Sequence, residues 1–380
     1  MTKILKRRIP VTLGMIVKNE ERLLPQCLET VYRRVAELMI VDTGSRDRTV
    51  EIARKFGARI LSRPGPSDGG MDRDRNLYLR HASQPWILSL DADERIASKD
   101  VLKIGELIRR KADGYCFNIR NYGDEYNLLR GWHPNKGEYP VEEKFAGTYG
   151  WATNRVTRLF RRDARYTYEG VHLLIEASIR RHGGIVWEAP FPLHHFECLK
   201  DRSFFLKKQR KYLRQGLKEL KSSLDPAKTH LDVAIGMFAV KKDDAAALLH
   251  LRRALRLRPG YTDVHKLLGV VYLETGETSS AKRHLETALR ARPKDPDLHC
   301  LLGAALMARG RNGPAIESLK KALRYQKDHP MAWCALGVAY ESQNHLSAAS
   351  EAYRRSLRIL PTFAAARENS SRLARKMDRG

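Results

Sequence analysis

A repeating period in the C-terminal half constrains the fold of this chain more than any other feature. Residues of one kind recur at a constant spacing, namely the Leu-Gly pairs at 268, 302 and 336, the alanines at 281, 315 and 349, and the alanines at 254, 288 and 322. A fixed period of roughly 34 residues is typical of stacked helical hairpins, in which small residues let two helices approach closely. This half of the chain is therefore expected to form an elongated helical stack.

The pattern resembles the tetratricopeptide repeat (TPR). Trp333 and Tyr340 occupy large aromatic positions, and prolines at 259, 293 and 361 would end the second helix of a hairpin. Within a TPR array at 228–380, we expect units at 228–261, 262–295, 296–329 and 330–363 and a capping helix at 364–376. The resemblance implies either a surface that binds a peptide or protein partner, or a module for packing and dimerisation.

The N-terminal half alternates short apolar runs with helical patterns. The expected strands are 9–17, 38–41, 58–61 and 86–90. Alternation of this kind predicts a mostly parallel sheet with helices on both faces. In such sheets ligands bind beyond the carboxyl ends of the strands. The polar turns that follow such ends here are 18–20, 42–47 and 91–94.

Two nucleotide-binding motifs are absent from the sequence, the Gly-x-Gly-x-x-Gly turn after the first strand and the P-loop. A dinucleotide-dependent oxidoreductase or a P-loop NTPase is therefore not expected. Asp91 and Asp93 stand two positions apart just after an apolar strand. Two carboxylates there suit a Mg²⁺ or Mn²⁺ ion that also binds a diphosphate. The residues alone leave an alternative open, a solvated pair of aspartates that caps the next helix.

Three segments taken together resemble glycosyltransferase family 2, the inverting group with the GT-A fold. They are VTLGMIVKNEERLLPQCLETV, LMIVDTGSRDRTVEIARKFGARIL and MDRDRNLYLRHASQPWILSLDADE. The resemblance covers residues 9–100 well and 101–200 less closely, although RLFRRDARYTYEGVH is still similar. It implies an α/β GT-A domain (Rossmann-like nucleotide-diphospho-sugar transferase) at 1–200 and a connecting helix at 201–227. A bacterial subgroup of the family carries C-terminal TPR units, as this chain does.

The resemblance implies nucleotide-binding roles for several residues. Asp42 would accept a hydrogen bond from the nucleobase, and Arg75 would lie near the nucleotide. The base and ribose pocket would be lined by Val17, Lys18 and Glu20. Judged from the residues alone, Asp42 could equally form a turn and Arg75 could be a surface charge.

The resemblance also implies a metal site. Asp93 would be the principal ligand of the Mn²⁺ or Mg²⁺ ion that bridges the diphosphate, and Asp91 would contact the ribose or the metal shell. Some GT-A enzymes use a late histidine as a further ligand. Of the pair 194–195, His194 is the preferred candidate, and a structural histidine is the alternative.

The sequence departs from the family at the expected catalytic base, because an acid is expected in a Gly-x-His-Glu-like segment. The sequence reads Glu169-Gly170-Val171-His172-Leu173, with leucine at the acid position. Glu169 is therefore the first candidate for the base, with Glu176 as another. His172 would orient the acceptor or serve as the base itself.

The formal net charge is +26, and residues 197–380 hold 36 basic against 19 acidic residues. Such an excess favours an anionic partner. No motif specific for nucleic acid accompanies it, so a nucleic acid is not expected as a specific partner. The resemblance implies a nucleotide-sugar donor, expected to be a UDP-sugar, and a glycan, lipid carrier or peptide as acceptor. A protein partner could bind through the repeats.

The sequence contains neither an apolar run of about 18 residues nor the apolar core of a secretory signal. We therefore expect a cytoplasmic protein, with the anionic inner face of the membrane as a peripheral location. Two functional classes stay open. One is a metal-dependent, inverting glycosyltransferase. The other is a non-catalytic TPR adaptor with a degenerate transferase domain, which Leu173 keeps in consideration.

Overall fold

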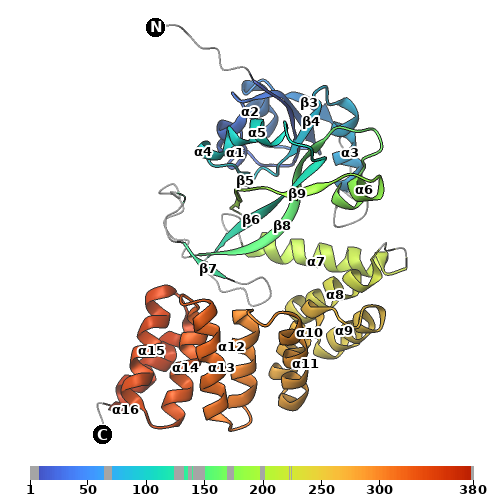
Figure 1. Ribbon diagram of the computed structural model, residues 1–380. Coiled ribbons are helices and arrows are strands. Elements are labelled where there is room, and N and C mark those ends of the chain that lie inside the picture. The colour runs from blue at the N-terminus through green and yellow to red at the C-terminus, as the bar shows by residue number, and fades with distance from the viewer. Residues whose placement is uncertain are drawn as a thin grey trace, which may run out of the picture. The chain divides into compact units, whose positions relative to one another are not determined.

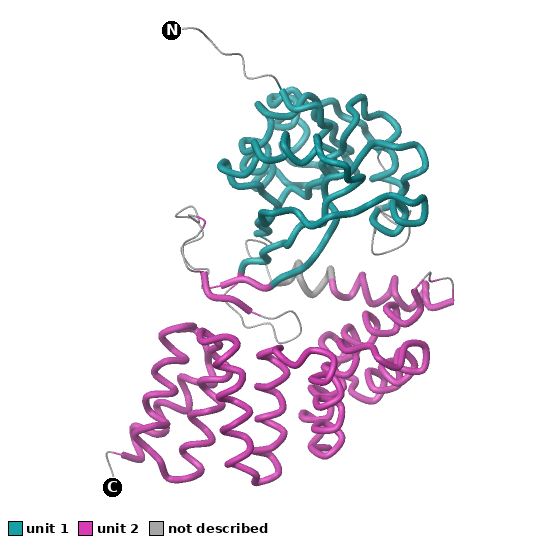
Figure 2. Tube along the Cα trace, viewed as in Figure 1, with its two compact units in different colours: residues 1–122, 153–199 teal, residues 123–152, 200–380 magenta. Residues whose placement is uncertain are grey.

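The computed structural model describes residues 8–63, 71–123, 132–135, 139, 150–168, 175–196, 202–221, 223 and 225–377. The chain divides into two compact units (Figure 2). The first contains residues 1–122 and 153–199, and the second contains residues 123–152 and 200–380. The segment 123–152 thus groups with the repeats, whereas the sequence placed it in the first domain. The domain limits at 1–200, 201–227 and 228–380 stay predictions about independent folding.

The first unit is built on a mixed sheet (Figure 1). The described strands of the chain are β1 (Ile9–Val17), β2 (Val35–Asp42), β3 (Arg59–Ser62), β4 (Trp86–Ser89), β5 (Glu94–Arg95), β6 (Gly114–Gly123), β7 (His133–Pro134), β8 (Gly150–Arg161), β9 (Val186–Glu188) and β10 (Leu193–His195). The helices of this unit are α1 (Leu24–Val31), α2 (Thr49–Lys55), α3 (Met71–His81), α4 (Ser98–Val101), α5 (Lys103–Leu107) and α6 (Ile175–Arg181).

The four strands expected from the sequence pair in parallel with one another, and β6 also pairs in parallel with β9 and β10. β1 pairs in parallel with β2 and with β4, and β2 pairs in parallel with β3. β4 then pairs antiparallel with β8, and the order continues through β6 and β10 to β5. The expected α/β architecture of this half is therefore confirmed, with a mixed rather than purely parallel sheet.

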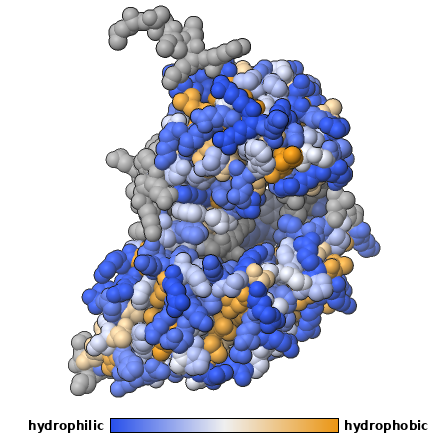
Figure 3. Space-filling view, viewed as in Figure 1, coloured by the Kyte–Doolittle hydropathy of each residue, from blue (hydrophilic) through white to orange (hydrophobic). Residues whose placement is uncertain are grey.

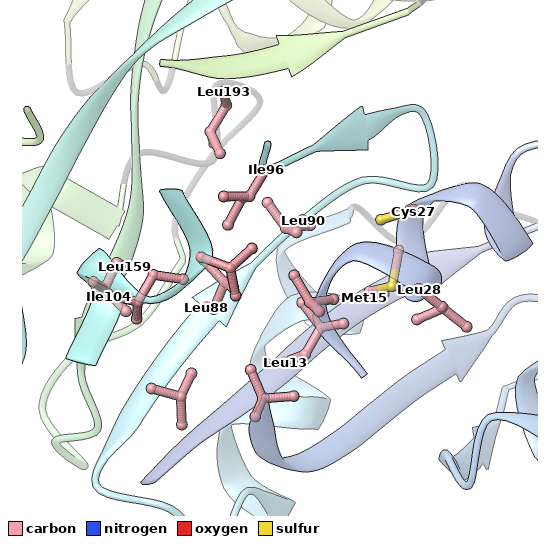
Figure 4. Close-up of a cluster of buried hydrophobic side chains, with 14 of the residues drawn as sticks. Leu13, Met15, Cys27, Leu28, Leu88, Leu90, Ile96, Ile104, Leu159 and Leu193 are labelled. Carbon is pink, nitrogen blue, oxygen red and sulfur yellow. The ribbon is translucent and has the colours of Figure 1, made fainter. Parts of the chain in front are cut away.

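The side chains of β1 alternate between the two faces of the sheet. Leu13 and Met15 pack in one core cluster with Cys27 and Leu28 of α1 (Figure 4). The other face carries Tyr78 of α3, in a second cluster that includes α6. A Cβ atom added at Gly14 would lie 2.5 Å from the Tyr78 ring, so glycine at this position lets α3 approach the sheet.

The second unit contains α7 (Arg202–Glu219) and the helical hairpins that the period predicts (Figure 1). Its hairpin helices are α8 (Pro226–Gly236) with a π-helical turn η4 (Met237–Lys241) and α9 (Asp244–Leu257), α10 (Thr262–Glu274) and α11 (Thr278–Ala291), α12 (Pro296–Met307) and α13 (Asn312–Tyr325), and α14 (Pro330–Ser342) and α15 (Leu346–Ile359). The capping helix is α16 (Ala364–Met377). The helical-repeat architecture expected for this half is therefore confirmed, and the limits of the single units stay predictions.

The contacts inside each hairpin explain why the period is conspicuous. A Cβ atom added at Gly269, Gly303 or Gly337 would lie between 2.5 and 2.7 Å from the side chain that packs against it. Those side chains are Leu285, Leu319 and Tyr353, which recur with the same period as the glycines. In these three hairpins a glycine of the first helix therefore faces a large residue of the second, whereas Gly236 of the first hairpin packs against Leu213 of α7.

A buried polar chain links three successive hairpins. The Nζ of Lys266 donates to Oδ2 of Asp297 at 2.9 Å, and Nε2 of His329 lies 3.1 Å from Oδ1 of the same carboxylate. All three side chains are 6% exposed or less. Nδ1 of His329 accepts the backbone N–H of Ala332, so the proton of a neutral imidazole is on Nε2 and is donated to Asp297.

Partly buried histidine pairs lie within the first and second hairpins. Nδ1 of His230 lies 3.0 Å from Nδ1 of His250, and Nδ1 of His265 lies 2.9 Å from Nδ1 of His284. Burial, with the neighbouring His265 and Arg283, lowers the pKa of His284 to about 4. His284 is therefore neutral at pH 7.

None of the described helices is long and apolar enough to cross a membrane.

Candidate functional site

The three polar turns expected at strand ends lie at one edge of the sheet. The register of β1 and β2 places Val17 beside Asp42, and that of β1 and β4 places Gly14 beside Ser89. Since these strands are parallel, the turns that follow them meet at the carboxyl edge, where α/β sheets bind ligands.

Hydrogen bonds join the first two turns into one structure. The N–H of Asn19 donates to the hydroxyl of Ser45 at 2.9 Å, and the side-chain oxygen of Asn19 accepts the N–H of Arg46 at 2.8 Å. The N–H of Glu20 donates to the hydroxyl of Thr49 at 2.8 Å. Asn19 has a φ of 55°, in the left-handed region that asparagine tolerates better than most residues. The turn at 18–20 is thereby held over the turn at 42–47.

Asp42 is buried at the end of β2 and shapes its own turn. Its carboxylate accepts the backbone N–H groups of Gly44 at 3.2 Å and Ser45 at 3.1 Å. These bonds give Asp42 the turn-forming role that was the alternative interpretation from the residues alone. A carboxylate has about four acceptor sites, so these bonds leave capacity for a ligand. Next to it, Val17 is buried and Lys18 is exposed.

Asp91 lies between two arginines just beyond β4. Nη2 of Arg75 donates to its Oδ1 at 2.8 Å, and Nη2 of Arg158 donates to its Oδ2 at 2.7 Å. The arginine side chains are 7% and 8% exposed, whereas the Asp91 side chain is 38% exposed. Burial opposes ionisation of Asp91, but Arg158 and Arg75 outweigh it and hold its pKa well below the usual range. The carboxylate is thus ionised, fixed in place and accessible from solvent.

Arg75 also contacts groups other than Asp91. Its Nη1 donates to the hydroxyl of Ser89 at 2.7 Å, and its guanidinium lies 5.3 Å from the centre of the Tyr168 ring. The hydroxyl of Tyr78 donates to the same Ser89 oxygen at 2.9 Å. Arg75 is therefore a buried residue and not a solvated surface charge.

Glu94 is the second carboxylate held by Arg158, at 2.5 Å from Nη2. It is 2% exposed, and its Oε2 accepts the backbone N–H of Asp91 at 3.1 Å. Burial raises the pKa of Glu94, against the opposing effect of Arg158. Arg158 therefore joins β8 to the turn after β4 and orients Asp91 from the side opposite Arg75.

Asp93 lies beside a histidine of β10. Nε2 of His195 is 3.5 Å from Oδ1 of Asp93, and Nδ1 of His195 is 2.7 Å from Oδ1 of Asn121. The preferred candidate, His194, instead places Nδ1 2.8 Å from the Tyr122 hydroxyl. Burial, followed by Arg120, lowers the pKa of His194 to about 4. The structure therefore brings His195 together with Asp93, and His194 contacts a buried tyrosine.

The candidates for the catalytic base, Glu169 and His172, lie outside the described residues, as does Leu173. The third candidate, Glu176, is described on α6. Its carboxylate accepts the hydroxyl of Thr157 at 2.9 Å and Nε of Arg180 at 2.9 Å. Thr157 therefore joins Glu176 to β8.

Sequence reasoning missed Arg158 and Glu94. A signal for Arg158 was present, because an arginine followed directly by Leu159 and Phe160 in a strand pattern is a charge inside an apolar run. A buried arginine requires a carboxylate partner. The polar turn 91–94 was the obvious place to look for one.

Replacing Arg158 with methionine is expected to lower stability at pH 7 by about 1–3 kcal/mol, because buried Glu94 loses its charged donor. The folded-state pKa of Glu94 is already raised and should rise further. Ionised Glu94 therefore lowers the free energy of unfolding only above the pKa that this glutamate has in the unfolded chain. The stability loss caused by Arg158→Met should shrink as the pH falls toward 4. Thermal unfolding at several pH values measures this. An equal loss at pH 4 and pH 7, or the same loss in the exposed-site control Arg165→Met, would contradict the pairing.

The donor set at this edge suits a hard divalent cation. Asp93 offers a carboxylate and His195 an imidazole, a combination that Mn²⁺ accepts. Asp91 is neutralised by two arginines, which weakens it as a direct ligand. Among the described residues, no group of three or more histidine, cysteine, aspartate or glutamate side chains is arranged as a complete metal site. An ion here would therefore need oxygens from water or from a bound diphosphate.

Comparison with known proteins gives separate matches for the two halves of the chain. The family model described as Glycosyl transferase family 2 matches residues 12–166. Two models described as Tetratricopeptide repeat match residues 242–305 and 300–362.

Individual relatives and solved structures are similar to parts of this chain. The lipopolysaccharide core biosynthesis glycosyltransferase LpsC of Rhizobium meliloti is 29% identical over 155 residues, covering 36% of this chain and 56% of LpsC. A TPR repeat-containing protein of Synechococcus elongatus is 46% identical over 86 residues, covering 23% of this chain and 21% of that protein. Among solved structures, a TPR protein of Thermus thermophilus has a TM-score of 0.40 and 21% identity, covering 46% of this chain and 94% of that one. The chain thus spans less than two thirds of both curated relatives.

Proposed function

Because residues 12–166 match glycosyltransferase family 2 and residues 242–362 match TPR units, we propose that this chain transfers a sugar from a nucleotide-sugar donor to an acceptor recruited by the repeats. The observation that carries the proposal is the carboxylate pair at the end of β4. Asp91 is ionised between two buried arginines, and Asp93 lies next to His195.

The donor would bind across the carboxyl edge of the sheet. The joined turns at 18–20 and 42–47 offer Val17, Lys18, Glu20 and Asp42 to the base and ribose, with a UDP-sugar as the expected donor. Arg75 would act through Asp91, since its guanidinium holds that carboxylate in place. The role proposed for Arg75 is therefore to position Asp91 toward the ribose.

Asp93 and His195 would hold a Mn²⁺ or Mg²⁺ ion, with Asp91 near it. A bound ion of this kind supplies positive charge against the leaving diphosphate. The sequence preference for His194 is replaced in this proposal by His195, because His195 contacts Asp93. Glu169 or His172 would take the proton from the acceptor as it attacks the anomeric carbon from the side opposite the diphosphate, which inverts the configuration there.

The repeats would supply the acceptor. Residues 197–380 carry 17 of the 26 net positive charges, which favours an anionic acceptor or carrier. The name of LpsC refers to lipopolysaccharide core biosynthesis, and this favours a glycan among the possible acceptor classes. Attraction between exposed charges is screened within about 8 Å at physiological ionic strength, so acceptor binding should weaken with added salt.

The test is a release assay for free nucleoside diphosphate, run on the full chain with a panel of nucleotide sugars. We expect release from one UDP-sugar above the others, dependent on Mn²⁺ or Mg²⁺ and lost in EDTA. Release that is unchanged in EDTA would remove the metal from the proposal. Binding of a nucleotide sugar without release, with every donor and metal tested, would favour the non-catalytic adaptor.

A further inference from the structure

Helix α7 carries a row of basic side chains that the proposed chemistry does not use. This basic row consists of Arg210, Lys211, Arg214 and Lys218 of the helix and of Lys221, which follows its end. Apart from the first two, successive members are three or four residues apart, and side chains at this spacing lie on one face of a helix. With a rise of about 1.5 Å per residue, the helical part of the row is about 12 Å long. All five side chains are exposed.

The packing of α7 explains why the basic row faces solvent. Leu213 is 4% exposed, and a Cβ atom added at Gly236 of α8 would lie 2.9 Å from its side chain. A Cβ atom added at Gly216 would lie 3.0 Å from Val233, also of α8. The helix therefore packs against α8 through the face that Leu213 and Gly216 share. Two residues span about 200° of a helix, so Lys211 lies on the side opposite Leu213.

The basic row has no partners of opposite charge. Within the described part of the chain, none of its five members forms an ion pair. The only acid of α7 is Glu219, whose carboxylate accepts Nε2 of Gln215 at 3.4 Å. Like charges three and four residues apart repel one another along a helix, so the row destabilises the helix on its own. An anionic surface that approaches the row would relieve this repulsion.

Two exposed apolar side chains border the basic row. Tyr212 is 41% exposed and Leu217 is 39% exposed. Tyr212 directly follows one member of the row and Leu217 directly precedes another, so at 3.6 residues per turn they lie on opposite flanks of it. Tyrosine is enriched at membrane–water interfaces, where its ring lies at the level of the lipid headgroups. A row of cations with apolar side chains on both flanks therefore matches a surface that presents phosphates above hydrocarbon.

Charge, and not a large apolar patch, would select the partner of this surface. On the face shown in Figure 3, hydrophilic side chains predominate over the repeats and apolar side chains are exposed between them. An anionic bilayer offers many phosphates in one plane, and its attraction grows with each lysine or arginine near the surface. A dissolved polyanion would meet the same charges but would give Leu217 no apolar environment.

We propose that α7 docks the chain on an anionic phospholipid surface, with the basic row at the lipid phosphates and Tyr212 and Leu217 among the headgroups. The opposite face of the helix stays packed on α8, so the helix lies on the bilayer and does not cross it. The docking requires no chemistry at Asp91 or Asp93 and goes beyond the proposed function. It also favours an acceptor that is attached to a lipid, and this consequence alone rests on the proposed function.

Sedimentation of the full chain with phospholipid vesicles tests the proposal. We expect the chain to bind vesicles of phosphatidylcholine with phosphatidylglycerol, to dissociate as salt is raised, and to stay in solution with phosphatidylcholine alone. The triple variant Lys211→Gln, Arg214→Gln and Lys218→Gln should bind about 100-fold more weakly, because each basic residue near an anionic surface contributes separately. Glutamine is also a good helix former, so the unfolding transition should not change. Equal binding to both kinds of vesicle, or undiminished binding of the triple variant, would overturn the proposal.

A second triple variant, Lys321→Gln, Arg324→Gln and Arg358→Gln, provides the matched control. It removes the same charge from exposed positions on α13 and α15 of the same unit. Its affinity for the anionic vesicles should stay within about threefold of the wild type, because exposed charges more than about 8 Å from the lipid are largely screened. A loss equal to that of the α7 variant would assign the binding to the net charge of the array and would overturn the docking site.

One further variant separates a bilayer from a dissolved polyanion. Leu217→Ser should weaken binding to the anionic vesicles by about threefold, because part of an apolar side chain is no longer removed from water. Its affinity for a DNA duplex, measured at the same salt concentration, should equal that of the wild type. Unchanged vesicle binding in Leu217→Ser, or binding of the duplex by a chain that leaves anionic vesicles free, would overturn the choice of a lipid surface.

Release of nucleoside diphosphate is measured without vesicles on the α7 triple variant, which should match the wild type. If the wild-type chain releases diphosphate and does not bind anionic vesicles, the docking fails and the proposed function stands. If vesicle binding depends on the basic row but no donor is turned over, the docking stands and the proposed function fails.

Discussion

Replacing Asp93 with asparagine is expected to lower release of nucleoside diphosphate by about 100-fold or more, with no change in the unfolding transition. The side chain is 7% exposed and contacts His195, so the isosteric amide keeps the packing and removes only the charge. Loss of one preorganised electrostatic group from a catalytic site has an effect of about this size. Initial rates at saturating donor, measured over a range of Mn²⁺ concentrations, give the result.

Two further variants separate the roles at this position. Asp163→Asn removes a partly exposed carboxylate that is paired with Arg165, and it should retain full activity. His195→Gln should raise the Mn²⁺ concentration required for half-maximal activity, whereas His194→Gln should leave that concentration unchanged. Full activity of Asp93→Asn, or a metal requirement altered only by His194→Gln, would show that the site is assigned to the wrong residues.

Replacing Asp297 with leucine is expected to destabilise the repeats by about 3–5 kcal/mol. Lys266 is 5% exposed and has its ion pair with Asp297, so the substitution leaves a buried ammonium group without its counter-charge. His329 loses its acceptor at the same time. Hydrogen exchange over 262–343 should report faster opening, because an array of repeats unfolds in parts and not as one unit.

A double-mutant cycle provides the control. Replacing Lys266 with methionine in the Asp297→Leu background removes the uncompensated charge and should restore most of the lost stability. The cycle isolates the coupling between the two residues. If the double variant is as unstable as Asp297→Leu alone, lost packing and not the buried charge accounts for the effect.

The helical half of the fold could be predicted because one contact repeats in three successive hairpins. A glycine in the first helix must face a large residue in the second, as Gly269 faces Leu285, and this steric requirement recurs in the sequence with the period of the repeat. The buried chain from Lys266 through Asp297 to His329 does not produce a recognisable pattern in the sequence. Its successive members are separated by 31 and 32 residues, so they do not follow the period that identifies the array.

The strand ends of the first unit could be predicted as well, because each apolar run stops at a polar turn. The placement of Asp42, Asp91 and Asp93 at strand ends rested on this, whereas their roles were implied by the family resemblance. All three lie at the carboxyl edge. Arg158 could not be found in the same way, since it reaches Asp91 from an antiparallel strand 67 residues further along the chain. The pairing of β4 with β8 is a long-range contact that no local pattern encodes.

The choice between His194 and His195 depended on strand register. Adjacent residues of a strand face opposite sides, so a shift of one position exchanges their environments. β10 has three residues and lies between β6 and β5. A strand this short shows no alternation from which the facing residue could be chosen, and the sequence preference for His194 therefore had no support from register.

The division of the chain into units has a consequence for how such proteins can be recombined. The backbone passes between the two units at 122/123, 152/153 and 199/200, and strands β6 and β8 continue across two of these points. A hybrid made by exchanging everything after residue 200 would therefore inherit residues 123–152 from the wrong parent. In that segment Trp132 accepts a hydrogen bond from Gln326 at 2.6 Å through its carbonyl oxygen. Exchange of the repeats between relatives should succeed only when residues 123–152 are transferred with them, so the insertion and the array are expected to be inherited together.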